Sequence, residues 1–297
     1  MEKNNQPLVS IVIPCYNHEQ FIQDCIQSVI DQTYENIELI IIDDGSKDNS
    51  ILKIQEMIEK SQNRFKRFEF RYRPNKGLSA TLNEALEWCQ GNYFSVIASD
   101  DILIDYKISR QVYYLESNLE VAGVFGAFQV INNKGAVVNI RKRKNAMYSF
   151  EDIFLHKHEL PAPTQLIRTH LIKEVGGYAE NILIEDWFMW LKISHLNFKF
   201  SYLDTIFVKY RRHENNTSKS IDKMMDGRIM IINLFKDDLL YSDALACAYL
   251  VSANDYLTIN KIKSWSNYRK FIKLRKNTNY FSSFKYILKL ITSFCFK

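Results

Sequence analysis

The chain has 297 residues, of which 46% are apolar and 25% are charged, so it can bury a substantial core and is not an intrinsically disordered protein. Its net charge of +5 is concentrated at one end, because residues 261–297 contain ten Lys or Arg and no Asp or Glu. Residues 1–260 hold 29 basic and 34 acidic residues, which excludes a uniformly basic surface for nucleic acid.

Cysteines and apolar runs indicate the compartment. The five cysteines form no CxxC pair, so they predict neither a disulfide framework nor a zinc site, and a reducing, cytoplasmic compartment fits best. The apolar run Leu8–Ile13 stops at Pro14, and the late run Tyr286–Phe296 is broken by Lys289. Neither run is long enough to predict a membrane span.

The first hundred residues alternate between strand and helix patterns. Helical periodicity is found at Glu19–Asp31 and Leu78–Cys89, between apolar runs typical of strands. These runs are Val9–Ile13, Glu38–Ile42, Phe68–Tyr72 and Tyr93–Ala98. Strands that alternate with helices at this spacing predict an α/β fold with a mainly parallel sheet flanked by helices.

The pattern is looser in the second half of the chain. We expect a helix at Ile104–Glu116, a strand at Val121–Ile131, a basic loop at Arg141–Lys144, a helix from Glu185, a strand at Phe198–Val208, and two helices within Met224–Leu257. The end of the chain, from Phe281, has an apolar sector with lysines outside it, which predicts an amphipathic basic tail.

Each strand of the first half is followed by polar residues. These clusters are Pro14–Asn17, Asp43–Ser46, Arg73–Gly77 and Ser99–Asp101. Because the carboxyl ends of parallel strands lie along one edge of a sheet, where ligands bind, the four clusters are expected to meet in one crevice.

Two of the clusters contain adjacent carboxylates, Asp43-Asp44 and Asp100-Asp101. A divalent cation would relieve the repulsion, and carboxylates without a Cys/His cage suit Mg²⁺ or Mn²⁺. Taken singly, Asp43-Asp44 is equally explained by a turn, and Asp100-Asp101 by a cap on the following helix. No GxGxxG or GxxxxGK[ST] motif is present, so a phosphate-bearing ligand would be held by metal and side chains.

The motifs Ser10–Asn17, Ile42–Ser50, Asn75–Asn83 and Ser99–Asp101, followed by Glu185–Trp187, resemble those of the family 2 inverting glycosyltransferases of the GT-A fold, of the bacterial cell-surface polysaccharide type. The resemblance covers residues 8–220. It implies a Rossmann-like catalytic domain at 1–220, with a nucleotide-binding half at 1–103 and an acceptor half at 104–220. Residues 221–297 are then a helical C-terminal region.

The resemblance also implies roles for the donor-side residues. Pro14, Tyr16 and Asn17 would line the nucleotide pocket, with Tyr16 near the base. Asp44 would accept a hydrogen bond from the imide N–H of a pyrimidine base. Asn75 and Gly77 would lie beside the nucleotide. Asp101 would bind Mn²⁺ or Mg²⁺, and Asp100 would contact ribose or metal, although Ser99-Asp100-Asp101 departs from the strict Asp-x-Asp spelling.

Asp186 is the predicted base, since an inverting transfer needs one carboxylate to take the acceptor's proton. The alternative explanation for Glu185 and Asp186 is that acidic residues are favourable at a helix N-terminus, where they interact with the helix dipole. Glu185, Trp187 and Trp190 are weak candidates for acceptor contact, and core packing explains the tryptophans equally well. Just after the Phe198–Val208 strand, Arg211 and Arg212 are candidates for contact with the donor diphosphate, and the alternative is that they are ordinary solvated charges. His213 is a candidate metal ligand, and the alternative is a histidine in a surface loop.

Together these observations predict a metal-dependent hexosyl- or N-acetylhexosaminyltransferase. It would move a sugar from a nucleotide-sugar, with UDP favoured, to a hydroxyl of a lipid-linked or cell-surface glycan. The basic tail predicts a peripheral location on the anionic inner face of the cytoplasmic membrane, homo-oligomerisation is open, and no nucleic acid partner is expected. A sugar-nucleotide nucleotidyltransferase and a non-catalytic glycan-binding protein are the alternatives. This chain lacks the Gly-rich triphosphate loop that a nucleotidyltransferase would need. A non-catalytic glycan-binding protein would not need Asp101 together with Asp186.

Overall fold

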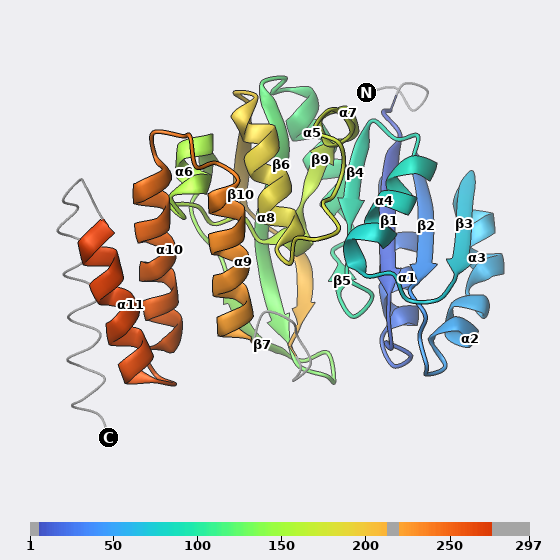
Figure 1. Ribbon diagram of the computed structural model, residues 1–297. Helices are drawn as coiled ribbons and strands as arrows, with labels where there is room; N and C mark the ends of the chain where they lie inside the picture. The colour runs from blue at the N-terminus through green and yellow to red at the C-terminus, as the bar shows by residue number, and fades with distance from the viewer. Residues whose placement is uncertain (1–5, 213–219, 275–297) are drawn as a thin grey trace. The chain divides into compact units, whose positions relative to one another are not determined.

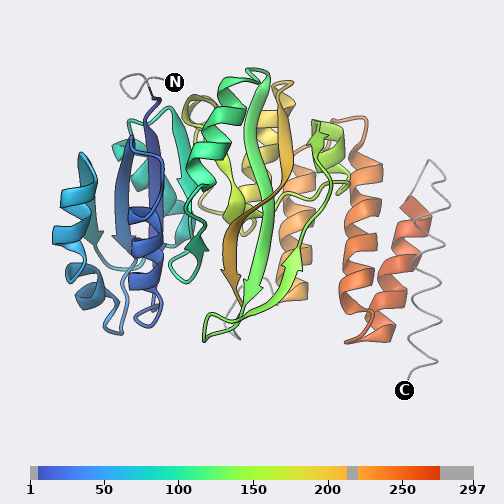
Figure 2. The same ribbon diagram turned by 180° about the vertical axis from the view of Figure 1, so that it is seen from behind.

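The computed structural model describes residues 6–212 and 220–274 (Figures 1 and 2). The chain forms two compact units. The first is drawn from Met1–Phe150, Glu159–Glu180 and Glu185–Glu214, and the second from Glu151–His158, Asn181–Ile184 and Asn215–Lys297. In this division, two short segments inside the domain predicted at 1–220 group with the C-terminal helices.

The first unit is built on a ten-stranded sheet with the order β3-β2-β1-β4-β9-β6-β10-β5, in which β7 also pairs with β6 and β8 with β10. The strands are β1 (Val9–Cys15), β2 (Ile37–Asp43), β3 (Arg67–Tyr72), β4 (Tyr93–Val96), β5 (Ile102–Leu103), β6 (Val121–Ile131), β7 (Val137–Arg141), β8 (Ala146–Tyr148), β9 (Leu166–Arg168) and β10 (Lys199–Arg211). Strands β1 to β4 are parallel to their neighbours among themselves, and β6 is parallel to β10. The predicted, mainly parallel α/β fold is confirmed.

Helices cover both faces of the sheet. Figure 1 shows α4 and α8 in front of the strands, and Figure 2 shows α1 and α5 in front of the opposite face. The helices of this unit are α1 (Ile22–Ile30), α2 (Ser50–Gln55), α3 (Ile58–Arg64), α4 (Leu78–Trp88), α5 (Lys107–Glu116), α7 (Thr169–Glu174) and α8 (Glu185–His195), with a 3₁₀ turn at Ala162–Thr164. The short helix α6 (Phe150–Phe154) lies where the chain passes between units.

The core explains why these segments fold as they do. Nearly all of β1 and all of β2 are buried, as in a parallel sheet that helices cover on both sides. Helix α1 buries Ile22, Cys25, Ile26 and Val29 on one face, as its periodicity predicts. The sheet and α1 therefore form a rigid base for the loops that follow the strands.

The second unit contains three longer helices, α9 (Ile221–Asn233), α10 (Tyr241–Tyr256) and α11 (Lys261–Leu274). Small residues of α10 pack against Tyr268 and Phe271 of α11. Lys263 of α11 forms an ion pair of 3.0 Å with Asp222 of α9. The predicted helical C-terminal region is confirmed, and the amphipathic tail from Phe281 lies outside the described residues. No helix in the described part of the chain is long and apolar enough to cross a bilayer.

Candidate active site

Four polar loops meet at one edge of the sheet. Strand β1 pairs in parallel with β2 and β4, and β2 pairs in parallel with β3, so all four carboxyl ends point the same way (Figure 1). The predicted polar clusters follow directly from these ends. The expectation that they share one edge is confirmed.

The loop after β1 is tied to the loop after β2. Asn17 has a φ of 55°, a left-handed conformation that Asn tolerates. Its backbone N–H donates to Ser46 Oγ at 2.8 Å, and its Oδ1 accepts the N–H of Lys47 at 2.8 Å. Tyr16 beside it is 45% exposed, so its ring is open to a ligand. Asn17 therefore has a structural role in joining the two loops, and its pocket-lining role stays a prediction.

Local hydrogen bonds satisfy the first carboxylate pair. Asp43 accepts the N–H of Ser46 at 2.8 Å and the Ser46 hydroxyl at 2.6 Å. Asp44 accepts the N–H groups of Lys76 at 2.8 Å and Gly77 at 2.9 Å, and it also pairs with Arg73. The Arg73 guanidinium and these hydrogen bonds relieve the repulsion between Asp43 and Asp44 without a metal ion, which corrects that part of the sequence argument.

These bonds hold the Asn75–Gly77 turn against Asp44. The Asn75 side chain donates to the Asp44 carbonyl at 2.8 Å. Gly45 has a φ of +81°, and a Cβ there would lie 2.7 Å from the Asn75 nitrogen, so only glycine fits. Arg73, which also bonds Glu84 at 2.7 Å, was not predicted as a site residue. Its position directly after β3 was the only signal.

The second carboxylate pair differs from the first. Asp101 is fully buried, and its Oδ1 accepts the backbone N–H of Arg211 at 2.8 Å. Its Oδ2 is buried and has no hydrogen-bond partner among the described residues. Burial, followed by the neighbouring charge of Asp100, raises the pKa of Asp101 well above its usual range.

An orphaned buried carboxylate oxygen suits a hard cation. Leaving such an acceptor unpaired costs about 1–3 kcal/mol, and Mg²⁺ or Mn²⁺ bound by one or two carboxylates would supply the missing partner. The described residues contain no ready-made cluster of three or more His, Cys, Asp or Glu, so further ligands would have to come from substrate or water. The capping alternative is wrong, because α5 begins at Lys107 after Tyr106 and has no side-chain cap.

A histidine that the sequence did not single out lies beside this pair. His18 Nδ1 is 2.7 Å from Ser99 Oγ and 4.0 Å from Asp100 Oδ1. The two segments are 81 residues apart in the chain. Ser99 and His18 therefore extend the polar edge from β4 toward the loop after β1.

Arg211 has a role different from the predicted one. Its side chain is 2% exposed, and its guanidinium lies 4.5 Å over the ring of Phe21. Nε donates to the Asp100 carbonyl at 2.8 Å, and Nη1 donates to the carbonyls of Asn132 at 3.1 Å and Asn133 at 3.0 Å. This geometry does not support a contact with a donor diphosphate. It fixes the Asp100-Asp101 turn to the turn after β6.

We expect Arg211→Lys to lower the free energy of unfolding by about 2–4 kcal/mol, because a lysine ammonium cannot satisfy three separate carbonyls as the guanidinium does. Urea denaturation measures the change. Arg212→Lys is the matched control, since Arg212 is exposed and should shift stability by less than about 0.5 kcal/mol. Equal stability of the two variants would contradict the role of Arg211.

Arg212 and His213 follow the end of β10. The backbone N–H of Arg212 donates to the Ile131 carbonyl at 3.0 Å, and its exposed side chain leaves the predicted diphosphate contact open. His213, the predicted further metal ligand, lies outside the described residues. The assignment of these two residues stays a prediction.

Glu185 and Asp186 occupy the first turn of α8. Burial and the charge of Asp186 raise the pKa of Glu185 to about 8, and burial raises the pKa of Asp186 as well. The buried Tyr178 hydroxyl, which has no hydrogen-bond partner in the described chain, has its pKa raised by burial and by these two carboxylates. The Tyr178 backbone is held to Asn83 of α4 by bonds of 2.8 Å in both directions. The pair is thus set in a low-dielectric site of the kind that tunes a base.

The tryptophans of α8 belong to the core. Trp187 is 4% exposed and Trp190 is 3% exposed. Trp190 packs edge-on against Phe125 at 5.0 Å, and its Nε1 donates to Gln165 Oε1 at 3.3 Å. In this structure neither ring is open to an acceptor sugar, so the core-packing alternative holds and the predicted platform is withdrawn.

Comparison with known proteins identifies the family. The profile described as glycosyl transferase family 2 matches residues 10–174, more than half of the chain. The chain belongs to glycosyl transferase family 2. A relative from Haemophilus influenzae, named an uncharacterized glycosyltransferase, is 33% identical over 229 residues, which are 72% of this chain and 68% of the relative. The predicted family and enzyme class are confirmed.

Two further comparisons agree with the assignment of this chain to family 2. The O-antigen biosynthesis glycosyltransferase WbnJ of Escherichia coli is 25% identical over 250 residues, covering 82% of this chain and 94% of WbnJ. The crystal structure of S. aureus TarS 1-349 in complex with UDP-GlcNAc has a TM-score of 0.65 at 18% identity, covering 96% of this chain and 79% of that structure. The latter similarity shows the GT-A fold, as predicted.

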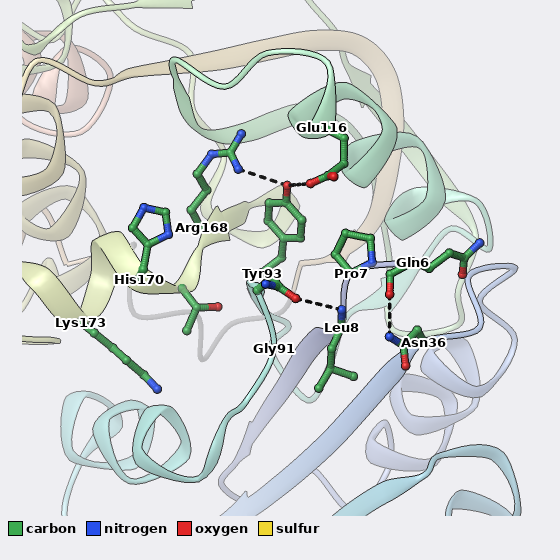
Figure 3. A pocket seen from close by; sticks show the side chains of 12 residues that line it. Gln6, Pro7, Leu8, Asn36, Gly91, Tyr93, Glu116, Arg168, His170 and Lys173 are labelled. Carbon is green, nitrogen blue, oxygen red and sulfur yellow. Dashed lines mark hydrogen bonds between the residues drawn. The ribbon is translucent and has the colours of Figure 1, made fainter. Parts of the chain in front are cut away.

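The glycosyltransferase also has a cavity of about 820 Å³ at the amino ends of β1 and β4, opposite the polar edge (Figure 3). Tyr93, Glu116 and Arg168 lie together in its wall. The Tyr93 hydroxyl donates to Glu116, and Arg168 donates to that hydroxyl at 3.2 Å and to backbone carbonyls. These groups satisfy one another, and no predicted site residue lines the cavity.

Proposed function

We propose that this glycosyltransferase moves a sugar from a nucleotide-sugar, with a UDP-sugar favoured, to an acceptor hydroxyl with inversion at the anomeric carbon, in a reaction that depends on Mn²⁺ or Mg²⁺. One observation carries the proposal. The buried Oδ2 of Asp101, which has no partner among the described residues, lies at the carboxyl edge of the sheet, where α/β folds bind nucleotides.

The donor side would be formed by the loops after β1, β2 and β3. Tyr16 offers an exposed ring to the base, and Asp44, held by the amides of Lys76 and Gly77, presents a fixed carboxylate. Pro14 and Asn75 would border the same pocket. Because hydrogen bonds of Asn17, Asp44 and Asn75 join the three loops, the loops are arranged before a ligand arrives.

The residues around Asp101 fit a divalent cation. Asp101, with Asp100 beside it, would hold Mn²⁺ or Mg²⁺, which when bound would neutralise the charge of the departing nucleoside diphosphate. Arg211 fixes the backbone of Asp100 and donates its own N–H to Asp101. The Arg211 backbone would therefore hold the proposed metal-binding carboxylate in place, and its buried guanidinium would hold the turn that carries it.

The proton chemistry would belong to Asp186. An inverting transfer needs one carboxylate that accepts the acceptor's hydroxyl proton during attack. Burial and the charge of Asp186 raise the pKa of Glu185 to about 8, so Glu185 keeps its proton near neutral pH. The pair would then carry one negative charge near neutral pH, and we assign the role of the ionised base to Asp186.

The acceptor would be a lipid-linked or cell-surface glycan. The name of the E. coli relative, an O-antigen biosynthesis enzyme, supports this class. The basic residues of 261–297 favour attachment to an anionic membrane, which would put the enzyme on the inner face of the cytoplasmic membrane. Sedimentation of the full chain and of a chain ending at residue 279 with anionic vesicles tests the attachment: equal binding would exclude the tail.

A panel of nucleotide sugars tests the function. Purified protein with Mn²⁺ should release free nucleotide from one UDP-sugar faster than from the rest of the panel, and EDTA should stop the release. Release of pyrophosphate from a sugar phosphate and a nucleoside triphosphate would instead show a nucleotidyltransferase. Sugar binding without any turnover would indicate a glycan-binding protein.

A further inference from the structure

Lys107 of α5 is a lysine buried in the core without a carboxylate beside it. Its side chain is 0% exposed, and among the described residues no Asp or Glu forms an ion pair with it. Its Nζ donates to Ser95 Oγ of β4 at 2.9 Å and to the Gln165 carbonyl at 3.1 Å. A buried ammonium without a counter-charge is costly, so the presence of a lysine here needs an explanation other than an ion pair.

The acceptors around Lys107 match an uncharged amine. An amine has two N–H groups, and the two acceptors are Ser95 Oγ and the Gln165 carbonyl. The Ser95 hydroxyl gives its own proton to the same carbonyl at 2.9 Å, so its oxygen is available to the lysine. An ammonium would carry a third N–H group, for which the described part of the chain supplies no acceptor.

The surroundings of Lys107 contain no charge that would keep it protonated. Strand β6, which packs against α5, has no ionisable residue. Ionisable side chains of α5 and of the other strands nearby are engaged elsewhere: Glu116 and Arg168 with Tyr93, Asp101 with the Arg211 N–H, and Asp204 with Lys142. Burial alone lowers the pKa of Lys107 to about 7.

Gln165 joins Lys107 to the helix that begins with the proposed base. Gln165 lies directly before β9, and its Oε1 accepts the Trp190 Nε1–H at 3.3 Å. Trp190 lies one turn after Asp186 on α8. Helices α5 and α8 cover opposite faces of the sheet (Figures 1 and 2), so Gln165 connects them at the position of β9, between β4 and β6.

Ser95 joins Lys107 to the strand of the proposed metal site. Ser95 is buried in β4, which leads into the Asp100-Asp101 turn. The Asp101 N–H donates to the Ala98 carbonyl at 3.0 Å, so this turn is built directly on the end of the strand. One amine therefore bonds to β4 and, through Gln165, to α8.

We propose that Lys107 is a positioning residue for sugar transfer, which as an uncharged amine holds α8 in register with β4. Satisfying the Gln165 carbonyl does not by itself require a lysine, because the Ser95 hydroxyl already donates to it. What the lysine adds is a bond that fixes both groups to α5. This inference rests on the proposed function and adds a residue that lies outside the site.

Lys107→Met tests the positioning role, because methionine keeps the length of the side chain and removes the amine. We expect turnover in sugar transfer to fall by about tenfold or more, since small displacements of a base are costly. UDP affinity with Mn²⁺ should stay within about threefold of the wild type. Trp190→Phe interrupts the same chain of bonds at its other end, and the double variant should lose little more than the worse single variant.

Gln111→Met is the matched control. Gln111 lies one turn further along α5, is equally buried, and donates to the carbonyls of Val124 at 3.0 Å and Thr164 at 2.7 Å. It makes no bond to Ser95 or Gln165. The control therefore removes two buried hydrogen bonds from the same helix face and should keep transfer within about threefold of the wild type.

Urea unfolding between pH 7.5 and 9.5 tests the uncharged amine. An unfolded lysine keeps its proton to about pH 10, whereas folded Lys107 releases it above about pH 7, so the wild type should gain stability over Lys107→Met as pH rises. The folded-to-unfolded ratio of the wild type relative to the variant should increase by up to about tenfold per pH unit. Below pH 7 both states hold the proton, and the difference should stop changing. Comparing two proteins cancels the other buried groups that titrate in this range.

Three results would overturn the inference. They are a stability difference that does not change with pH, wild-type transfer by Lys107→Met, and an equal loss of transfer in Gln111→Met. UDP titration with Mn²⁺ keeps the two proposals apart. Failure of the wild type to bind UDP would contradict the proposed function, whereas normal UDP binding and full transfer by Lys107→Met would contradict only the role of Lys107.

Discussion

Asp186→Asn should reduce sugar transfer by about 100-fold or more, because asparagine cannot take the proton of the attacking hydroxyl. The fold should be retained, since the substitution replaces a partly buried carboxylate with a neutral group of the same shape. Transfer is measured with the donor found in the nucleotide-sugar panel. Calorimetric titration with UDP and Mn²⁺ should give an affinity within about threefold of the wild type, because the base does not contact the nucleotide.

Glu185→Gln is the matched control for this prediction. Burial and the charge of Asp186 keep Glu185 protonated up to about pH 8, so a neutral glutamine should preserve most of the transfer at neutral pH. Burial also raises the pKa of Asp186, and a base must be ionised, so transfer by the wild type should rise with pH from the acid side. If Glu185→Gln loses as much transfer as Asp186→Asn, or if UDP binding falls with transfer, Asp186 is not the base.

Asp101→Asn should lower metal-dependent turnover by about 100-fold or more, which corresponds to about 3 kcal/mol of lost stabilisation of the leaving group. The variant should fold, because the amide keeps the oxygen that accepts the Arg211 N–H and no longer buries a carboxylate with an unpaired oxygen. Thermal unfolding checks the fold, and donor hydrolysis across a Mn²⁺ titration checks turnover. Wild-type turnover by the variant, or full activity of the wild type in EDTA, would show that Asp101 is not a ligand of a catalytic metal.

Much of the sheet edge proposed to bind the donor was predictable from sequence, because apolar strand patterns and the polar residues that follow them coincide there. The buried apolar runs of β1 and β2 fix two central strands, and the polar residues at their ends are adjacent in sequence. The short elements β5, β8, β9 and α2 were not predicted, since each is too brief to show a period. Strand β7 was missed for another reason: both of its faces are exposed, so no alternation of apolar and polar residues marks it.

The failures within the site arise from contacts between distant segments. Arg73 meets Asp44 across 29 residues, and His18 meets Ser99 across 81, and neither pairing has a signature in the sequence. The spacing of Trp187 and Trp190 puts them on one helix face but does not say what that face meets. Arg211 illustrates the same limit, because its charge suggested a ligand and its burial assigns it to carbonyls.

Binding of UDP to the wild type and to Asp101→Asn, each with Mn²⁺ and with EDTA, tests the central claim most directly. The account predicts that the wild type binds UDP with Mn²⁺, that EDTA weakens this binding by about tenfold or more, and that Asp101→Asn with Mn²⁺ resembles the wild type in EDTA. UDP binding that is the same with Mn²⁺ and with EDTA, and unchanged in Asp101→Asn, would contradict it.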